Sequence, residues 1–339
     1  MIQTQNLSKT FRVHKKVAGL AGSVKSLFNR QWLDKQALRD VTLHVGSGEI
    51  LGLVGANGAG KTTLVKILAG VIHPSSGSVS ILGHNPWSRS NDFRRQISLI
   101  MGQKAQLWWD LPAEDCFLLL REIYQIPHPQ YKQNLEYLVE SLGVKDQLNI
   151  QIRRLSLGER MKMELIAALL HTPRVVFFDE PTIGLDLTAQ RAIRNFILEY
   201  RKLHKPAMIL TSHYMEDIER LCPRIAIIKD GQIVYDGDLA RVVNTYANHK
   251  ILSVEFETEV SPAQSPKAFA ALNAEVIFQD SSTVRLKVAR TAVAQVAGQM
   301  LQQFRVKDLS IEEEDIGNII EKLIRRDKDV SGKIVTPKL

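Results

Sequence analysis

One stretch of this 339-residue sequence decides its fold: Gly55-Ala56-Asn57-Gly58-Ala59-Gly60-Lys61-Thr62, which fits the pattern GxxxxGK[ST]. The apolar run Ile50–Val54, typical of a strand, comes before it, and an apolar helical stretch follows. Between a strand and a helix, the glycines let backbone N–H groups converge on a phosphate, and the helix N-terminus adds roughly half a positive charge. This context argues against a chance glycine-rich turn and predicts a nucleotide phosphate-binding loop in an α/β fold.

An acidic pair, Asp179-Glu180, follows the apolar run Val175–Phe178. Such a run is typical of a strand buried on both faces, and the carboxyl ends of parallel strands are where α/β sheets bind ligands. We expect Lys61 to pair with the β- and γ-phosphates, and Thr62 and Asp179 to hold Mg²⁺. Glu180 is suited to orient and deprotonate the attacking water. Alone, the pair also fits an ordinary polar strand end; beside a phosphate loop it indicates nucleotide hydrolysis.

Four further motifs occur at intervals along the chain. With the two above, the ordered set is Gly55–Thr62, Gln103, Leu155-Ser156-Leu157-Gly158-Glu159, Asp179-Glu180-Pro181, Gly184-Leu185-Asp186 and His213. In this set the sequence resembles the ABC ATPase family, whose motifs are the Walker A, Q-loop, signature, Walker B, D-loop and H-loop. The resemblance covers about residues 1–240, and six motifs in one order are highly specific.

The resemblance implies how these positions work together. Two copies would dimerise head to tail, each ATP lying between the Walker A loop of one copy and the signature of the other. Gln103 would sense Mg²⁺ and the attacking water and link to a membrane subunit. His213 would contact the γ-phosphate and the attacking water, and Asp186 would join the two active sites. Phe11 matches the aromatic residue that stacks on adenine.

The expected site divides into three sets of residues. The expected catalytic residues are Glu180, His213 and Gln103, and the expected Mg²⁺ ligands are Thr62, Gln103 and Asp179. The residues expected to bind ATP are Phe11, Gly55, Asn57, Gly58, Gly60, Lys61, Thr62, Thr63, Ser156, Gly158 and Asp186. A lone histidine after a strand is more often a core residue. The order of the motifs instead favours a functional role for His213.

The signature also has a reading from the residues alone. Ser156 followed three residues later by Glu159 is a capping box, which predicts a helix running to about Leu170. A helix start offers free N–H groups to a phosphate. The family's common form is LSGGQ, and here Leu157 is the third residue and Glu159 the fifth. Ser156 and Gly158 remain, so we expect a working half-site, while direct ligand contact by Glu159 stays open.

Three regions follow from the pattern of apolar and polar residues. Residues 1–240 are expected to form an α/β P-loop NTPase core of the ABC ATPase type, with strands at 1–11 and Leu38–Val45 and a mainly helical signature subdomain at 104–172. Residues 247–325 are expected to form a small α+β accessory domain, and 326–339 a flexible tail. The accessory domain is predicted to be a ferredoxin-like β-α-β-β-α-β unit followed by a helix. Its elements are Ile251–Glu257, Pro266–Leu272, Val276–Gln279, Val284–Val288, Ala292–Gln303, Val306–Glu312 and the last helix Ile316–Ile324.

A local basic insertion is expected at residues 12–36, with a short amphipathic helix at Val17–Phe28. Residues 12–39 carry seven Lys or Arg against one Asp, in a chain of net charge +8. This segment fits a solvated surface as well as contact with anionic headgroups or a membrane partner. Trp108-Trp109, after Gln103, fit internal packing as well as contact with a membrane subunit.

The location of the chain is predicted from what its sequence lacks. No run reaches the roughly 20 apolar residues that cross a bilayer, and the start has no charged and apolar regions of a secretory signal. The two cysteines, Cys116 and Cys222, lie far apart in no metal or redox pattern and are expected to be buried thiols. We expect a cytoplasmic protein, peripheral on the inner face of the cell membrane.

Three kinds of ABC protein were weighed against these features. Ribosome-acting members usually carry two motif sets in one chain, and DNA-repair members split the halves with a long coiled coil. Here there is one set, Lys61 and Asp179 are 118 positions apart, and no sustained heptads occur. The basic segment alone does not make a nucleic-acid site, so no nucleic-acid partner is expected. The run Leu155–Arg160, the turn Thr182–Asp186 and a helix-ending appendage resemble the bacterial exporter branch that includes antibiotic-resistance and sodium-extrusion ATPases. We therefore expect the ATP-hydrolysing subunit of an exporter with two separate permease chains, an importer being the alternative. The transported substrate is selected by the membrane subunits and cannot be predicted from this chain. The accessory domain is expected to steady the dimer or to bind a regulatory ligand.

Overall fold

The computed structural model describes residues 1–14, 32–246, 248–257, 274–314 and 316–320. The chain divides into two units, Met1–Gly237 and Asp238–Leu339. Each unit has a hydrophobic core of its own.

The first unit is built on a six-stranded sheet with the order β5-β6-β7-β3-β8-β9. These strands are β3 (Ile50–Val54), β5 (Ile97–Met101), β6 (Val175–Asp179), β7 (Ala207–Thr211), β8 (Arg224–Lys229) and β9 (Gln232–Asp238). The pairs from β5 to β8 are parallel, and β3 and β7 are buried at every residue. The sequence prediction of buried parallel strands is confirmed. Asp230 and Gly231, at φ 47° and 82°, form the hairpin turn between β8 and β9.

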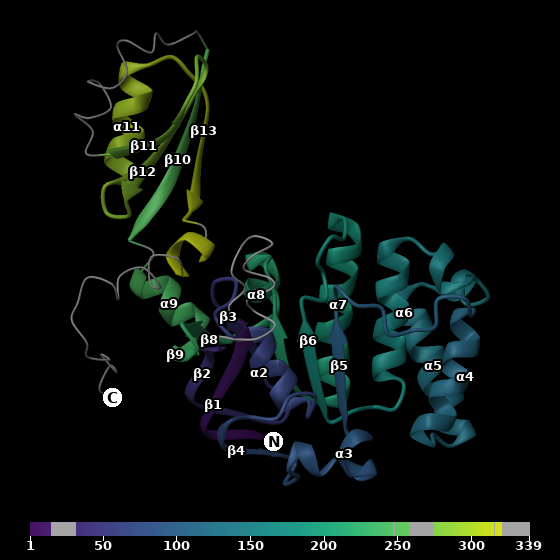
Figure 1. Cartoon of the computed structure of the whole chain (residues 1–339). Helices are drawn as coiled ribbons and strands as arrows, with labels where there is room; N and C mark the ends of the chain where they lie inside the picture. Colours follow the sequence, from purple (N-terminus) through teal and green to yellow (C-terminus); the bar gives the residue numbers. More distant parts are fainter. Residues whose placement is uncertain (15–31, 247, 258–273, 315, 321–339) are drawn as a thin grey trace, which may run out of the picture. The chain divides into compact units, whose positions relative to one another are not determined.

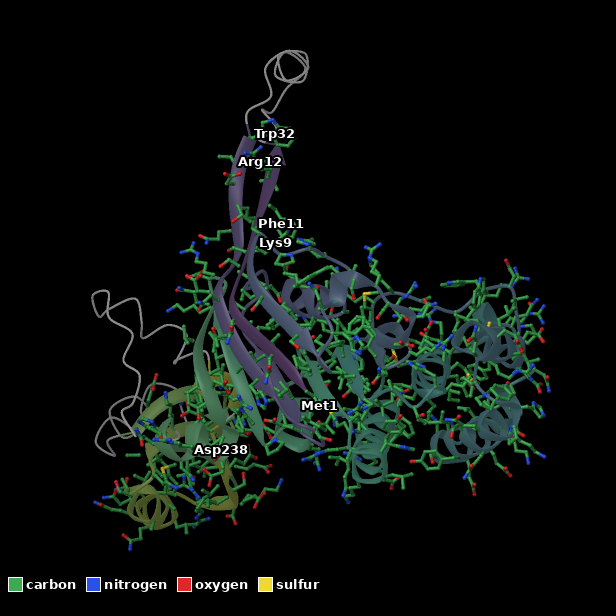
Figure 2. The ribbon with its side chains drawn as sticks, turned by 90° about the horizontal axis from the view of Figure 1, so that it is seen from below. Met1, Lys9, Phe11, Arg12, Trp32 and Asp238 are labelled. Atoms are coloured by element: carbon green, nitrogen blue, oxygen red, sulfur yellow. The ribbon has the colours of Figure 1, made fainter. Side chains whose placement is uncertain are left out.

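A second, antiparallel sheet has the order β2-β1-β4, with β1 (Ile2–His14), β2 (Trp32–Val45) and β4 (Ser76–Ile81). The predicted first two strands were too short. Phe11 pairs with Lys35 and His14 with Trp32, so residues 12–14 and 32–36 are strand rather than insertion. Backbone hydrogen bonds need no apolar side chain, and pairing therefore continues past the apolar pattern. Figure 2 shows this pair as an arm that extends beyond the rest of the unit. The helix predicted at Val17–Phe28 lies outside the described residues.

Helix α2 (Lys61–Leu68) lies at the centre of the first unit's core. Leu64, Val65, Ile67 and Leu68 are fully buried, in one cluster with side chains of both sheets. Burial of an apolar side chain of this size contributes on the order of 2 kcal/mol. The loop between β3 and α2 is therefore held at both ends by buried elements.

The other helices of the first unit surround the six-stranded sheet. They are α3 (Asn91–Arg94), α4 (Ala113–Tyr124), α5 (His128–Leu142), α6 (Leu157–Leu169), α7 (Leu187–His204) and α8 (Met215–Leu221), with short 3-10 turns η1 (Pro86–Ser88), η2 (Lys145–Gln147) and η3 (Ile152–Arg154). Figure 1 shows α4, α5 and α6 together at one end of the unit, beyond β5 and α7. These helices fall within residues 104–172, for which the sequence predicts a mainly helical subdomain. Cys116 and Cys222 are buried free thiols, and burial raises the pKa of both.

The second unit contains a four-stranded antiparallel sheet with the order β11-β12-β10-β13. Its elements are α9 (Leu239–Tyr246), β10 (His249–Phe256), β11 (Ala274–Gln279), β12 (Thr283–Ala289), α11 (Val293–Gln303) and β13 (Val306–Glu313). Alternate residues of β10 and β12 are buried against α11, which is the pattern of a sheet covered on one face. The described strands and α11 have the order along the chain and the sheet order of the predicted ferredoxin-like α+β unit. The helix predicted at Pro266–Leu272 and the tail 326–339 lie outside the described residues, and 316–320 are helical as predicted.

Within the described part of the chain, no helix is both long enough and apolar enough to span a bilayer.

Candidate functional site

The phosphate-binding loop runs from the end of β3 to the start of α2. A side chain at Gly55 would place its Cβ 2.2 Å from the carbonyl oxygen of Ile228, so only glycine fits there. Gly60, at φ 116°, begins the helix in a backbone region that favours glycine. Asn57 and Gly58 are exposed at the tip, and Thr63 is half-buried in the first turn of α2. The loop therefore leaves its backbone N–H groups open to an anion at a helix start.

Lys61 is buried, and its Nζ donates hydrogen bonds to the carbonyl oxygens of Gly55 at 2.6 Å and Ala56 at 3.2 Å. Burial lowers the pKa of Lys61, and the charges of Glu180 and Asp179 oppose that shift. The ammonium group thus lies inside the curve of the loop, with two carboxylates close enough to act on its charge.

Asp179, at the end of β6, receives two hydroxyl groups on one oxygen. Its Oδ1 accepts from Thr62 Oγ1 at 3.1 Å and from Thr211 Oγ1 at 2.7 Å. Thr211 ends β7 and is the register partner of Asp179 in the parallel sheet. Thr211 was not among the predicted site residues, although its place at the end of an apolar strand was the available signal.

Glu180 is the meeting point of the three predicted catalytic residues. Its Oε2 accepts from Gln103 Nε2 at 2.9 Å, and its Oε1 lies 2.8 Å from His213 Nε2. The side chain of Glu180 is nearly buried, whereas that of His213 is 39% exposed. Glu180 has φ 60°, a strained value for a residue with a side chain, which costs on the order of 1 to 3 kcal/mol. Strain of this kind is concentrated at functional sites.

Gly102 explains how Gln103 reaches Glu180. A Cβ at Gly102 would lie 1.8 Å from the carbonyl oxygen of Glu180, and the Gly102 N–H donates to the Asp179 carbonyl at 2.9 Å. The two strand ends approach this closely only because residue 102 has no side chain. The sequence analysis missed this glycine, which differs from its neighbours only in being small.

The signature residues lie elsewhere in the first unit, at the start of α6. Ser156 is the N-cap, and the predicted capping box is present: Ser156 Oγ accepts from the Glu159 N–H at 3.3 Å, and Glu159 Oε2 accepts from the Ser156 N–H at 2.9 Å. Ser156 Oγ also donates to Glu159 Oε2 at 2.7 Å. These bonds from Ser156 lower the pKa of Glu159.

The start of α7 lies against the start of α6. Asp186 is the N-cap of α7, accepting from the Ala189 N–H at 2.8 Å, and is exposed. A Cβ at Gly158 would lie 3.1 Å from Ala189 Cβ, and one at Gly184 would lie 3.3 Å from Leu157 Cδ2. The fold therefore brings together Ser156, Gly158 and Asp186 on one surface, and Lys61, Thr62, Asp179, Glu180, Gln103 and His213 in a second group.

Phe11 lies apart from both groups, on the arm formed by β1 and β2. It is half-buried, and Lys9 Nζ lies 5.0 Å from the centre of its ring (Figure 2). Phe11 belongs to the strand that continues into the core of the first unit.

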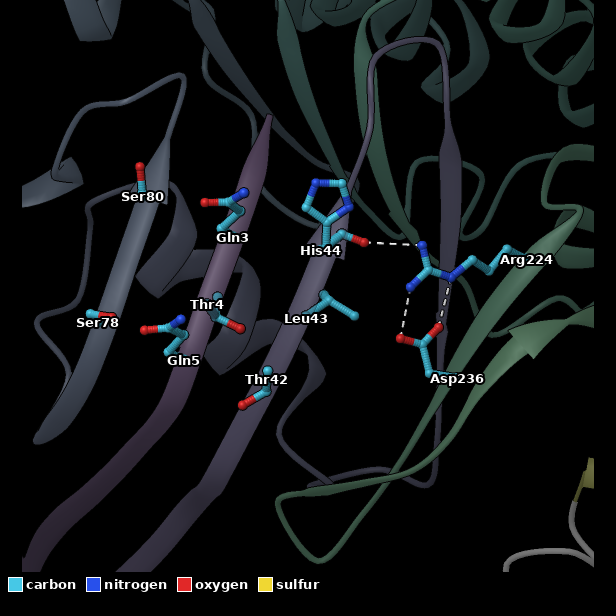
Figure 3. Close-up of a pocket in the computed structure, with 10 residues that line it drawn as sticks. All are labelled: Gln3, Thr4, Gln5, Thr42, Leu43, His44, Ser78, Ser80, Arg224 and Asp236. Atoms are coloured by element: carbon cyan, nitrogen blue, oxygen red, sulfur yellow. Dashed lines mark hydrogen bonds and ion pairs between the residues drawn. The ribbon is translucent and has the colours of Figure 1, made fainter. Parts of the chain in front are cut away.

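A polar pocket of about 510 Å³ lies on the antiparallel sheet and contains none of these residues (Figure 3). Arg224, which lines it, binds both oxygens of Asp236 at 2.7 Å and Glu49 Oε1 at 2.7 Å. These carboxylates raise the pKa of Arg224. Because the charge of Arg224 is neutralised by Asp236 and Glu49, this pocket is a poorer anion site than the loop at Gly55–Thr62.

The donor set at Asp179 fits Mg²⁺ and a nucleotide triphosphate. Thr62 and Asp179 supply hydroxyl and carboxylate oxygens, the hard ligands that Mg²⁺ prefers, and the loop supplies N–H groups and the Lys61 ammonium for phosphates. In the described residues no group of three or more His, Cys, Asp or Glu forms a metal cage. Mg²⁺ commonly takes one or two protein carboxylates and shares the rest of its shell with phosphates and water.

Two protein-family models match the chain. The one described as ABC transporter matches residues 38–183, and the one described as EvrA-like ABC transporter, C-terminal domain, matches residues 248–312. The first covers the phosphate-binding loop, the signature and Asp179-Glu180. The second covers the sheet of the second unit.

Known proteins resemble the chain over most of its first unit. The ABC transporter ATP-binding protein NatA of Bacillus subtilis is 31% identical over 215 residues, which are 62% of this chain and 87% of that protein. The Nod factor export ATP-binding protein I of Burkholderia thailandensis is 31% identical over 61% of this chain and 68% of its own length. A solved dimeric ATP-binding cassette in a post-hydrolysis state with ADP and Pi shares the fold, with a TM-score of 0.58 at 21% identity over 70% of this chain and 99% of its own. The chain therefore belongs to the ATP-binding proteins of ABC transporters, and it is an ATP hydrolase that uses ATP and Mg²⁺.

Proposed function

We propose that this chain drives export of a substrate through two separate membrane permease subunits, working as a head-to-tail pair of copies. The observation that carries the hydrolytic part of the proposal is the convergence of Gln103 and His213 on the carboxylate of Glu180, beside the phosphate-binding loop. The printed name of one relative, a Nod factor export ATP-binding protein, supports the direction. An importer is the alternative.

Each residue of the site has a chemical part in this proposal. Bound ATP and Mg²⁺ supply an electrophilic γ-phosphoryl group whose charge the metal offsets. Thr62 and Asp179 hold the metal through oxygen atoms, and Lys61 pairs with the terminal phosphates. Glu180 accepts the proton of the attacking water on a carboxylate oxygen, and Gln103 and His213 orient that carboxylate and the water.

The second copy completes the site. Ser156 and Asp186 begin two neighbouring helices at one exposed surface, so a partner that meets one meets the other. The N-terminus of α6 offers N–H groups and a positive dipole end to a γ-phosphate held by the partner's loop. Gly158 keeps the approach of α6 to α7 close. Phe11 is proposed to stack on adenine, and Gly55, Asn57, Gly58, Gly60 and Thr63 to surround the phosphates.

The permease contact is proposed at an apolar strip on the helical subdomain. This strip is defined by large side chains that are 37% to 60% exposed: Trp108, Trp109, Leu118, Leu119, Ile123 and Ile150. Trp109 also has the guanidinium of Arg160 5.2 Å from its ring centre, and Arg160 belongs to α6, the signature helix. A permease that presses on Trp109 would therefore act on the helix that begins at Ser156.

Two regions receive broader proposals. We propose that the basic segment at residues 12–39 contacts anionic headgroups and that the chain is peripheral on the inner face of the membrane. The second unit is proposed as an accessory domain, 247–325, that steadies the pair of copies.

The test of the catalytic assignment is Glu180→Gln in the full-length chain. ATP turnover is expected to fall at least about 100-fold, while ATP still binds and an ATP-bound dimer accumulates in size-exclusion chromatography with light scattering. Glu140→Gln, an exposed glutamate of α5, is the matched control. Normal turnover in Glu180→Gln would refute its role as base.

The test of coupling and direction uses inside-out membrane vesicles that contain the chain and two candidate permease proteins. Na⁺, a cationic dye and a polyketide antibiotic serve as probes. ATP-dependent accumulation of a probe in the lumen supports export, and ATP-dependent release from preloaded vesicles identifies an importer. Ile123→Ser is expected to weaken recovery of the chain with the membrane proteins. Unchanged recovery would contradict the apolar strip as the permease contact.

A further inference from the structure

A buried carboxylate lies behind the site and takes no part in the chemistry described above. Asp217, in the first turn of α8, is fully buried. Its Oδ1 accepts from Arg194 Nε at 2.5 Å, and its Oδ2 accepts from the hydroxyl groups of Ser212, at 2.5 Å, and Thr182. Every partner of this carboxylate is itself buried.

The two hydroxyl groups come from the segments that carry the catalytic pair. Thr182 stands two residues after Glu180, and Ser212 stands directly before His213. Ser212 Oγ also accepts a hydrogen bond from the backbone N–H of Tyr214 at 3.0 Å. The residue before His213 is therefore bonded to the residue after it. Asp217 therefore fixes the segment on each side of the 2.8 Å contact between Glu180 and His213.

The network continues from Arg194 to the loop before α7. Arg194 forms a second ion pair with Glu216 at 2.9 Å, and its Nη2 donates to Gln190 Oε1 at 3.0 Å. Gln190 Nε2 donates to the carbonyl oxygen of Leu185 at 3.0 Å. Leu185 directly precedes Asp186, which lies on the surface proposed to meet the second copy. A continuous set of hydrogen bonds thus connects that surface with the catalytic pair.

Stability is a weak explanation for such a network. Desolvating two charges offsets most of their attraction, and well-packed apolar side chains in place of a buried ion pair are often neutral or stabilising. An ion pair that fixes geometry has a different requirement. Here Arg194 must hold the Asp217 oxygens where the hydroxyl groups of Ser212 and Thr182 can donate to them.

We propose that Asp217 is a positioning residue for ATP hydrolysis: backed by Arg194, it holds Glu180 and His213 at their working separation and joins them to the loop that ends at Asp186. The proposal rests on the roles proposed above for Glu180 and His213. In this arrangement a partner copy that settles against Asp186 acts on the catalytic pair through Leu185, Gln190, Arg194 and Asp217.

The test compares two variants of the full-length chain. Asp217→Asn is expected to lower kcat for ATP about tenfold or more, with KM and ATP binding changed less than about twofold, because positioning acts on the transition state. Arg194→Met with Asp217→Leu replaces both charges by apolar side chains; it is expected to have a higher Tm than Asp217→Asn, which leaves the buried Arg194 charge without Asp217, while kcat stays low. A purely structural role predicts that kcat recovers together with Tm, and that result would overturn the proposal. Asp92→Asn, in the first turn of α3, is the matched control.

Two milder variants keep the test decisive if Asp217→Asn fails to fold. Ser212→Ala and Thr182→Val each remove one hydroxyl donor and no charge. Each is expected to lower kcat severalfold at unchanged ATP affinity, and wild-type kcat in both would overturn the proposal. Glu180→Gln separates the two levels of inference: if it turns over normally, the proposed function fails, whereas an inactive Glu180→Gln beside a fully active Asp217→Asn refutes this inference alone.

Discussion

Glu164 accepts a hydrogen bond from the backbone N–H of Gln106 at 2.8 Å, and the same oxygen lies 3.2 Å from the N–H of Leu107. Glu164 is a buried residue of α6, the helix that begins at the signature serine. Burial raises the pKa of Glu164, and its two backbone hydrogen bonds oppose the shift. The carboxylate thus ties the signature helix to the segment that follows Gln103.

Glu164→Leu is expected to destabilise the first unit by about 2 to 4 kcal/mol, because two buried N–H groups lose their acceptor. Glu164→Gln keeps an acceptor oxygen of the same reach and should cost less than about 1 kcal/mol. Urea denaturation followed by tryptophan fluorescence measures both, since Trp108 and Trp109 lie beside the segment. Equal stability of the two variants would show that the backbone bonds are unimportant.

Phe11→Ala is expected to raise KM for ATP about tenfold with kcat changed less than twofold, because stacking of a base on an aromatic ring contributes about 1 to 3 kcal/mol. Phe11→Trp should keep the wild-type KM. Val13→Ala, on the same exposed arm, is the control for effects on the strand itself. Steady-state ATPase assays measure all three, and an unchanged KM in Phe11→Ala would remove Phe11 from the nucleotide site.

Much of the fold could be predicted because its signals are local. Val175–Phe178 is a run of neighbouring apolar residues, and the capping box at Ser156 spans four residues, so each can be recognised without knowing what packs against it. The strand ends at 12–14 and 32–36 could not, because the backbone makes their pairing and their exposed side chains, Val13, Trp32 and Leu33 among them, do not show the alternation of a half-buried strand.

The supporting residues of the site were beyond the sequence analysis for a different reason. Arg194 and Asp217 lie 23 positions apart on two helices and meet only after α7 and α8 pack. Gly102 matters through the carbonyl of Glu180, 78 positions away. Nothing in the local pattern distinguishes such residues from surface charges or ordinary turns. The motif residues themselves were found because their order along the chain resembles a known family.

Glu159→Gln is expected to strengthen ATP-dependent dimerisation. The hydrogen bonds from Ser156 lower the pKa of Glu159 and keep it charged at neutral pH, next to the helix start proposed to receive the γ-phosphate. A neutral amide keeps the helix cap and removes the repulsion between the Glu159 carboxylate and the γ-phosphate. Two unit charges about 4 Å apart in water interact by on the order of 1 kcal/mol. Light scattering at increasing protein concentration, in the Glu180→Gln background with ATP, should give a dimer Kd at least about threefold lower. An equal or higher Kd would contradict the placement of Ser156 at the partner's phosphate.

His171 is expected to make the first unit sensitive to acid. It is 8% exposed, its Nε2 lies 3.1 Å from the carbonyl oxygen of Ile97, and its ring stacks on Tyr124 at 3.9 Å. Burial lowers the pKa of His171 to about 4.

Because the folded imidazole stays neutral while the unfolded one takes up a proton, the stabilising contribution of His171 is fully present above pH 6.5 and is lost as the pH falls from 6.5 towards 4. His171→Phe keeps the stacking and removes the titration. It should be less stable than the wild type at pH 8, and this difference should shrink by about 2 kcal/mol at pH 5. Urea unfolding at pH 8, 7, 6 and 5 measures it, and a difference that stays constant across this range would mean that His171 is not kept neutral by burial.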